Sequence, residues 1–108
     1  MVLNESTEKA MERLLTSNRS GELFWVEEKK EFVVRSYRRG VTLAYLSRLE
    51  WGDLMDLVGV TSRMLEGMEG GSGECQILSR RNTDLDVLEL VVLHPMAEKW
   101  EGEMLGEN

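Results

Sequence analysis

The sequence predicts an α+β domain: an antiparallel four- to five-stranded sheet packed by one long central helix and a short N-terminal helix. Three patterns support this fold. Two segments rich in aromatic and β-branched residues flank a polar turn at residues 27–30. A capping box at residues 47–50 precedes apolar residues at helical spacing. An apolar segment at residues 85–93 then reads as a strand that is buried on both faces.

The 108 residues form one predicted domain, because a chain of this length buries about 65% of its unfolded surface on folding. We divide it into an N-terminal helical part (1–20), an α+β core (21–94) and an acidic C-terminal tail (95–108). The single cysteine, Cys75, excludes an internal disulfide and suits a reducing compartment. Glutamates interrupt the N-terminal segment and the longest apolar run, 90–93, is short, so neither a signal peptide nor a membrane span is expected. These features predict a soluble, cytoplasmic protein.

Residues 4–17 read as the short N-terminal helix. Apolar residues recur on one side of it, and the acids near its start are stabilised by the positive end of the helix dipole. Residues 23–26 and 32–37 follow as the two strands of a hairpin. After a glycine turn, residues 41–46 are expected to add a third strand.

The long helix is the most strongly marked element. Residues 47–50 read Ser-Arg-Leu-Glu, a capping box in which the serine hydroxyl accepts a backbone N–H and the glutamate reaches back. Beyond it, apolar residues recur at steps of three and four as far as Met68, with charged residues on the other side. Gly59 weakens this helix, and the glycine-rich residues 70–73 end it.

Residues 74–80 and 85–93 read as the last two strands, joined by a turn at residues 81–84. The second of these strands is apolar on both faces, which is typical of a strand in the middle of a doubly covered sheet. The long helix is expected to cover one face. The other face has three candidate covers: the N-terminal helix, a second subunit or a ligand. A chain with this much apolar surface is expected to form a homodimer.

The net charge of −7 opposes nucleic-acid binding, which is driven by cations that replace counterions. The distribution of charge softens this objection. Residues 35–81 hold seven bases and six acids, whereas residues 84–108 hold seven acids and one base. Nine of the 13 bases are arginine, which suits planar stacking and bidentate phosphate contacts. We therefore expect a nearly neutral middle with local basic clusters.

Residues 22–51 contain every aromatic residue except Trp100, together with four arginines. A ring beside a guanidinium group offers an unstacked base a flat face and its phosphate a cation. The candidate stacking residues are Trp25, Tyr37, Tyr45 and Trp51, and the candidate phosphate contacts are Arg35, Arg38, Arg39, Arg48, Arg80 and Arg81. A hydrophobic core remains the alternative for the rings, above all for Phe24 and Phe32, and a solvated turn is the alternative for the last arginine pair.

The sequence does not predict an enzyme. His94 and Cys75 lie 19 residues apart on different predicted strands, without metal-ligand spacing and without a group that would orient them as a nucleophile pair. The glycine-rich residues 70–73 lack the lysine of a phosphate-binding loop, and the sequence has no dinucleotide motif. We expect no cofactor and no metal.

Residues 35–40 (Arg-Ser-Tyr-Arg-Arg-Gly), 41–43 (Val-Thr-Leu) and 49–54 (Leu-Glu-Trp-Gly-Asp-Leu) follow one another in an order that resembles a known family. It is similar to the single-stranded-DNA-binding domain of the positive-cofactor transcriptional coactivators, where a strand with Arg and Tyr leads through a glycine turn to a helix that begins near a Trp. That domain ends with its helix, whereas this chain continues into two further strands.

Strands on both sides of the long helix look more like the archaeal ThermoDBP group. This resemblance implies a small dimeric or higher-order α+β protein that holds bases of single-stranded DNA in an apolar cleft. A composition rich in Arg, Glu, Val and Leu, with one isoleucine, suits a GC-rich thermophile.

Two functions remain in competition. The leading hypothesis is a non-catalytic protein that binds single-stranded DNA, or RNA, as a dimer and with little sequence preference. The alternative, which the net charge favours, is an acidic adaptor or assembly subunit that docks a helix or a sister chain through methionine and tryptophan side chains.

Overall fold

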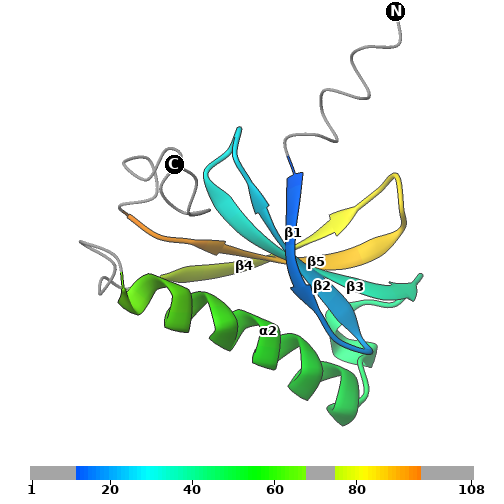
Figure 1. The fold of residues 1–108 in the computed structure, drawn as a ribbon. Helices are drawn as coiled ribbons and strands as arrows, with labels where there is room; N and C mark the ends of the chain where they lie inside the picture. Colours follow the sequence, from blue (N-terminus) through cyan, green and yellow to red (C-terminus); the bar gives the residue numbers. More distant parts are fainter. Residues whose placement is uncertain (1–11, 68–74, 96–108) are drawn as a thin grey trace, which may run out of the picture.

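The computed structural model describes residues 12–67 and 75–95. In chain order the elements are β1 (Glu12–Ser17), β2 (Gly21–Val26), β3 (Glu31–Arg39), the 3₁₀ helix η1 (Leu43–Tyr45), α2 (Arg48–Glu66), β4 (Gln76–Asn82) and β5 (Val87–Leu93). The five strands form one antiparallel sheet in the order β1-β2-β3-β5-β4, and α2 lies across one face of it (Figure 1). The α+β fold with one long helix is thus confirmed.

The core lies between α2 and the sheet. Alternation along each strand turns every second side chain toward the helix, and α2 supplies apolar residues at helical spacing. The buried core residues are Leu23, Trp25, Phe32, Val34, Leu54, Leu57, Leu65, Leu90 and Val92. Trp25 and Phe32 meet edge to face, with ring centroids 5.0 Å apart. Each buried aliphatic or aromatic side chain contributes about 1.5–3 kcal/mol relative to an exposed one.

The predicted N-terminal helix is wrong over residues 12–17, which form strand β1; residues 4–11 of that prediction lie outside the described part of the chain. Leu14 and Leu15, which suggest one helical stripe, point to opposite sides of the sheet. Leu15 packs against the core, whereas Leu14 is half-exposed on the other face. Backbone pairing with β2 outweighs the local helical pattern.

The third strand predicted at residues 41–46 is also wrong. The chain turns at Gly40, whose φ is +74°, and residues 43–45 form η1. Strand β3 already has β2 on one side and β5 on the other, so the chain that follows it finds no free edge beside it. The alternating apolar residues of this segment therefore do not enter the sheet.

The last hairpin has the predicted strands, but its turn lies at residues 83–86 rather than 81–84. Asp86 closes it in the left-handed region, with φ +59°, and its N–H donates to the carbonyl of Asn82 at 2.7 Å. Strand β5 lies between β3 and β4, and six of its seven residues are buried, as predicted for a strand that is apolar on both faces.

Candidate functional site

The face of the sheet opposite α2 carries two neighbouring rows of side chains, one apolar and one charged. Directly opposed residues on paired strands point to the same face, so the register defines each row. The apolar row is Leu14, Phe24, Val33, Val91 and Leu78, and it crosses all five strands. The charged row beside it is Ser17, Glu22, Arg35, Glu89 and Arg80.

Glu89 lies between Arg35 and Arg80 in the charged row and is 1% exposed. Its Oε2 accepts from Arg35 Nε at 2.6 Å and from Asn82 Nδ2 at 3.0 Å, and its Oε1 accepts from Arg80 Nε at 2.8 Å. Burial alone would raise the pKa of Glu89, but the hydrogen bonds from Asn82, Arg35 and Arg80 outweigh it and lower this pKa. Glu89 is therefore an anion held between two arginines.

Both arginines continue across the apolar row to acids on its far side, where Glu12 and Glu31 flank Val26. Arg35 donates to Glu12 from Nη1 at 3.3 Å and from Nη2 at 3.1 Å, while Arg80 donates from Nη1 to Glu31 at 3.2 Å. The guanidinium group of each arginine is thus bound by one carboxylate at Nε and by another at its Nη atoms.

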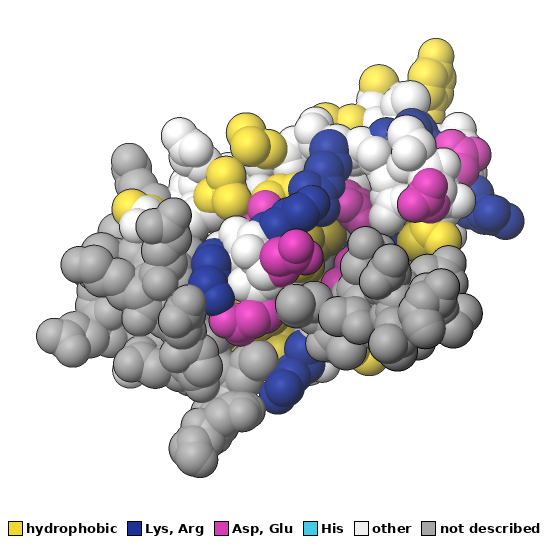
Figure 2. All heavy atoms as spheres, turned by 90° about the horizontal axis from the view of Figure 1, so that it is seen from above, with side chains coloured by type: hydrophobic (Ala, Val, Ile, Leu, Met, Phe, Trp, Pro, Cys, Tyr) yellow, Lys and Arg dark blue, Asp and Glu magenta, His cyan; other side chains and the backbone are white. Residues whose placement is uncertain are grey.

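This arrangement contributes to closing the middle of the apolar row to solvent. Val33 is 0% and Val91 3% exposed, although α2 lies on the other side of the sheet. The methylene stems of Arg35 and Arg80 run over the row, and the Arg35 guanidinium lies 4.6 Å over the Phe24 ring. In Figure 2, which looks onto this face, basic side chains lie across hydrophobic ones and between acidic ones.

Trp25 is a core residue, and its predicted role as a stacking residue is wrong. It is 0% exposed, and its Nε1 donates to Glu27 Oε1 at 2.8 Å. Alternation along β2 places Trp25 on the same face as Leu23, toward the helix. Its ring is therefore out of reach of a ligand.

The other three predicted rings are exposed. Tyr37 is 49%, Tyr45 76% and Trp51 42% exposed. They belong to one segment of 15 residues (37–51), here named the aromatic end, which contains the last residues of β3, η1 and the first turn of α2. Five of the nine large apolar side chains that are exposed in the described ranges lie in this segment, since Leu43 and Leu49 join the three rings. Exposed apolar side chains are thus concentrated in this segment of the described chain.

The start of the aromatic end is anchored to the hairpin of β4 and β5. The N–H of Gly40 donates to the carbonyl of Asp86 at 2.8 Å. Val41 is buried, and its carbonyl accepts from Arg81 Nη2 at 2.8 Å. Arg81, predicted to contact phosphate, thus braces this loop and also pairs with Asp86. The exposed residues beyond Val41 therefore project from a fixed base.

The capping box predicted at residues 47–50 is confirmed and fixes the other half of the aromatic end. Glu50 N–H donates to Ser47 Oγ at 3.0 Å, and Ser47 N–H donates to Glu50 Oε1 at 2.9 Å. The same Oε1 accepts from Arg38 Nη1 at 2.9 Å. The hydrogen bond from the Ser47 backbone, helped by Arg38, lowers the pKa of Glu50. Leu49 and Trp51 are presented from this capped turn.

The aromatic end has a local positive charge in an acidic chain. Its three arginines, Arg38, Arg39 and Arg48, are exposed, and Glu50 is its one acid, so three positive charges minus one leave +2. The whole chain carries −7. The exposed apolar side chains of this segment are therefore interspersed with basic residues along the chain.

A pocket of about 250 Å³ connects the charged row to the aromatic end. It is lined by Glu22, Arg35, Ser36, Tyr37, Arg39, Leu85 and Val87. Arg39 Nε donates to the carbonyl of Leu85 at 3.2 Å, which holds that side chain against the hairpin. The structure thus brings Arg35, Tyr37 and Arg39 to one pocket, whereas Arg81 lies on the helix side of the sheet.

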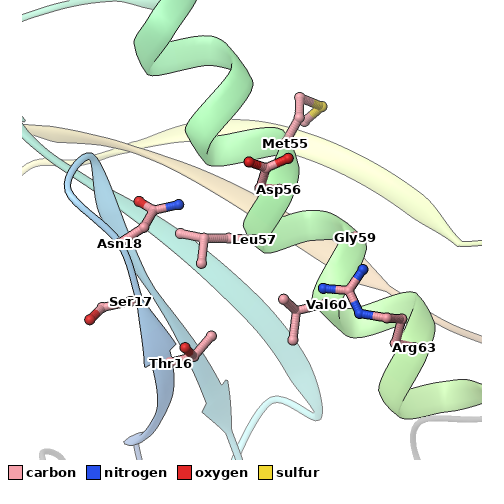
Figure 3. A pocket seen from close by; sticks show the side chains of 9 residues that line it. All are labelled: Thr16, Ser17, Asn18, Met55, Asp56, Leu57, Gly59, Val60 and Arg63. Atoms are coloured by element: carbon pink, nitrogen blue, oxygen red, sulfur yellow. The ribbon is translucent and has the colours of Figure 1, made fainter.

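A second pocket, of about 390 Å³, lies between the end of β1 and the side of α2 (Figure 3). Its lining residues are Thr16, Ser17, Asn18, Met55, Asp56, Leu57, Gly59, Val60 and Arg63. Leu57 and Val60 point from the helix toward the strand in this view. None of the residues predicted to bind a ligand lines this pocket, and hydroxyl, amide, carboxylate and guanidinium groups surround it without a histidine or thiol.

Cys75 and His94 line a third pocket, of about 460 Å³, at the end of β4 and β5. Burial raises the pKa of the Cys75 thiol, so at neutral pH the thiol is protonated and is a weak nucleophile. Residues 12–67 and 75–95 contain no group of three or more side chains that could hold a metal ion. In the same ranges, no helix has the length and apolarity needed to cross a bilayer.

No protein-family model matches this chain, and it has no significant match among curated proteins or solved structures.

The carboxylates of the network were missed by sequence reasoning, and so were the two exposed leucines. A signal for Glu89 exists in the sequence, because an acid inside an apolar strand requires a cationic partner once it is buried. The exposure of Leu43 and Leu49 has no comparable signal, since it depends on where the segment leaves the sheet.

Proposed function

We propose that this chain is a non-catalytic protein-binding module, an adaptor or assembly subunit, whose docking surface is the aromatic end. The observation that supports this most is the set of five exposed large apolar side chains within residues 37–51, held on an anchored loop and a capped helix start. Trp, Tyr and Arg dominate the energetics of protein interfaces, and Trp51, Tyr45 and Arg48 are all available here.

Three features favour a protein over a nucleic acid as the partner. Leu43 and Leu49 offer no flat face for a base, but they suit the apolar centre of a protein interface. Arg35 and Arg80, two of the expected phosphate contacts, are engaged by carboxylates. A net charge of −7 repels a polyanion.

The charge of the aromatic end specifies the chemistry of the partner. Exposed apolar side chains interspersed with arginines fit a segment that has apolar side chains on one side and acids beside them, such as an acidic amphipathic helix. Arg38 and Arg48 would meet those acids, and Tyr45, Leu49 and Trp51 would meet the apolar side chains.

Site-specific photo-cross-linking in cells that express this protein tests the proposed function. A photoreactive phenylalanine derivative at Tyr45 is expected to give discrete protein adducts, identified by mass spectrometry. The same group at Ser62, an exposed position farther along α2, is the control and is expected to give none of them. Identical adducts from both positions, or none from Tyr45, would contradict the proposal.

Binding of single-stranded nucleic acid is the second candidate, favoured by one specific observation. Tyr37 lies between Arg35 and Arg39 on the lining of the pocket of about 250 Å³, so a half-exposed ring and two guanidinium groups surround one recess. Stacking contributes about 1–3 kcal/mol per base. The family resemblances of residues 35–54 point to the same ligand and stay predictions.

Fluorescence anisotropy with labelled oligo-dT and a duplex control separates the two candidates. Nucleic-acid binding predicts a preference for the single strand and a slope of about −0.7 per neutralised phosphate in log affinity against log salt. Tyr37→Ala should then weaken binding more than Tyr45→Ala. A complete lack of binding at about 50 mM salt, where electrostatic attraction is strong, would retire this candidate.

A further inference from the structure

Strand β4 (Gln76–Asn82) forms one edge of the sheet, and within the described ranges no strand pairs with its outer side. All seven of its residues pair with β5 in unbroken register. An edge this long and regular presents a row of backbone N–H and C=O groups and is a template for a further strand.

The opposite edge of the sheet is protected in a way that β4 is not. The register of β1 with β2 shifts between Leu14 and Thr16. Such an irregularity twists an edge and interrupts its outer hydrogen-bonding groups, which discourages pairing with another chain.

The charged residues of β4 do not protect its edge either. A charged side chain blocks an edge when its head extends into the space that a new strand would occupy. Arg80 is instead drawn inward over the sheet by Glu89, and Arg81 is drawn inward by Asp86. The edge is left with two exposed aliphatic side chains, Ile77 at 47% and Leu78 at 52%, one on each face.

We propose that a second copy of this chain occupies the edge, with the two β4 strands antiparallel about a two-fold axis at Leu78. The two five-stranded sheets then become one sheet of ten strands. Leu78 of each copy faces the other on the side opposite α2, so the apolar row continues from one copy into the next. In this register Ile77 lies opposite Ser79, and Gln76 lies opposite Arg80.

Pairing of the two β4 strands in this register also keeps their like charges apart. The Arg80 side chains of the two copies are separated by four residues along the strands, which is about 14 Å. This distance exceeds the screening length of about 8 Å at physiological salt, so their repulsion is weak. Each Arg80 also keeps its own Glu89 and Glu31.

A matched pair of substitutions tests the interface. Leu78→Lys places a charge at the proposed axis, whereas Leu14→Lys makes the same change at 51% exposure in the same apolar row, on the opposite edge. Sedimentation at about 100 µM protein, where a micromolar dimer is largely associated, is expected to show dimers for the unmodified chain and for Leu14→Lys. Leu78→Lys should weaken association at least tenfold while retaining the circular dichroism of the folded chain.

If the unmodified chain is monomeric under these conditions, the proposal is wrong. It is also wrong if the Leu14→Lys variant dissociates as strongly as Leu78→Lys. Because Leu78 lies outside the aromatic end, Tyr45→Ala is expected to leave the dimer intact, and the outcome is therefore separate from that of the docking surface.

Cross-linking tests the register itself and does not depend on how the lysine variants fold. In a Cys75→Ser background, which removes the single native thiol, Leu78→Cys is expected to form an intermolecular disulfide when glutathione disulfide is the oxidant. Leu14→Cys is the control and should remain monomeric on a non-reducing gel. A Leu78→Cys variant that does not cross-link would exclude a two-fold axis at this residue.

Discussion

Arg35 in the charged row and Arg38 in the aromatic end both lie within two residues of Tyr37 in the sequence, yet their surroundings differ. Arg35 in the charged row has a side chain that is 13% exposed and is held by two carboxylates. Arg38 at the aromatic end is 55% exposed and meets one carboxylate, Glu50, at a helix start. The difference arises because the register places Glu89 directly opposite both Arg35 and Arg80. An arginine beside a ring is therefore structural where a carboxylate faces it across the sheet, and accessible to a ligand elsewhere.

Among the residues of the charged row and the aromatic end, replacement of Glu89 should have the largest effect on stability. Glu89→Ala leaves Arg35 and Arg80 without their shared partner over the apolar row, and removing one member of a buried ion network costs about 3–5 kcal/mol. Urea unfolding measures this loss. A loss of less than about 1 kcal/mol would show that the charged row contributes little to stability and would erase the contrast with the aromatic end.

Lowering the pH should reduce the stability that the charged row contributes to the fold. The pKa of Glu89 is lower in the folded chain than in the unfolded one, so its contribution to stability is present above the unfolded pKa of about 4.3 and is lost as the pH falls through the folded pKa. The free energy of unfolding is therefore expected to fall below about pH 5.

The matched control for this pH dependence is Glu89→Gln, which removes the titrating group. Its stability should fall less steeply with acid than that of the unmodified chain, while the lowered pKa values of Asp53 and Glu50 keep part of the slope. Equal slopes for the two proteins would show that Glu89 does not titrate differently on folding.

Loss of the helix cap should have a smaller effect, located at the aromatic end. Ser47→Ala removes the acceptor for the Glu50 N–H and is expected to cost about 1 kcal/mol in urea unfolding. Ser62→Ala, at an exposed position inside α2, is the control and should change stability by less than about 0.5 kcal/mol. If both variants lose the same free energy, the cap is not what holds the start of α2.

The smallest change in stability is expected for the exposed rings themselves. Tyr45→Ala and Trp51→Ala should each alter the free energy of unfolding by less than about 0.5 kcal/mol, because neither ring is buried. Each should nevertheless weaken binding of the cross-linked partner by about 2 kcal/mol or more, measured by titration calorimetry. Phe32→Ala changes a core residue instead and should destabilise the chain by about 3–5 kcal/mol.

Local patterns predicted the elements that depend on local interactions. The capping box and the leucines of α2 specify the helix within one segment, and the alternation around residues 23–37 specifies the hairpin. Residues 12–17 and 41–46 were misassigned because their structure depends on which edges of the sheet are free, and that is decided by strands far away in the chain.

The candidate site was predictable to a similar extent. The exposure of Tyr37, Tyr45 and Trp51 agrees with the sequence pattern, while the buried Trp25 could have been assigned from its alternation with Leu23. The pairing of Arg35 with Glu89 joins residues 54 positions apart, so no local pattern reveals it.

Two tryptophans of the described chain give it built-in optical reporters. Trp25 lies entirely within the core and Trp51 is 42% exposed, so their indole emissions differ in wavelength and in access to a soluble quencher such as iodide. In a Trp100→Phe background, denaturant should shift the emission of Trp25 to the red, while an occupied aromatic end should shield Trp51 from iodide. One cuvette can therefore separate unfolding from ligand capture without an added label.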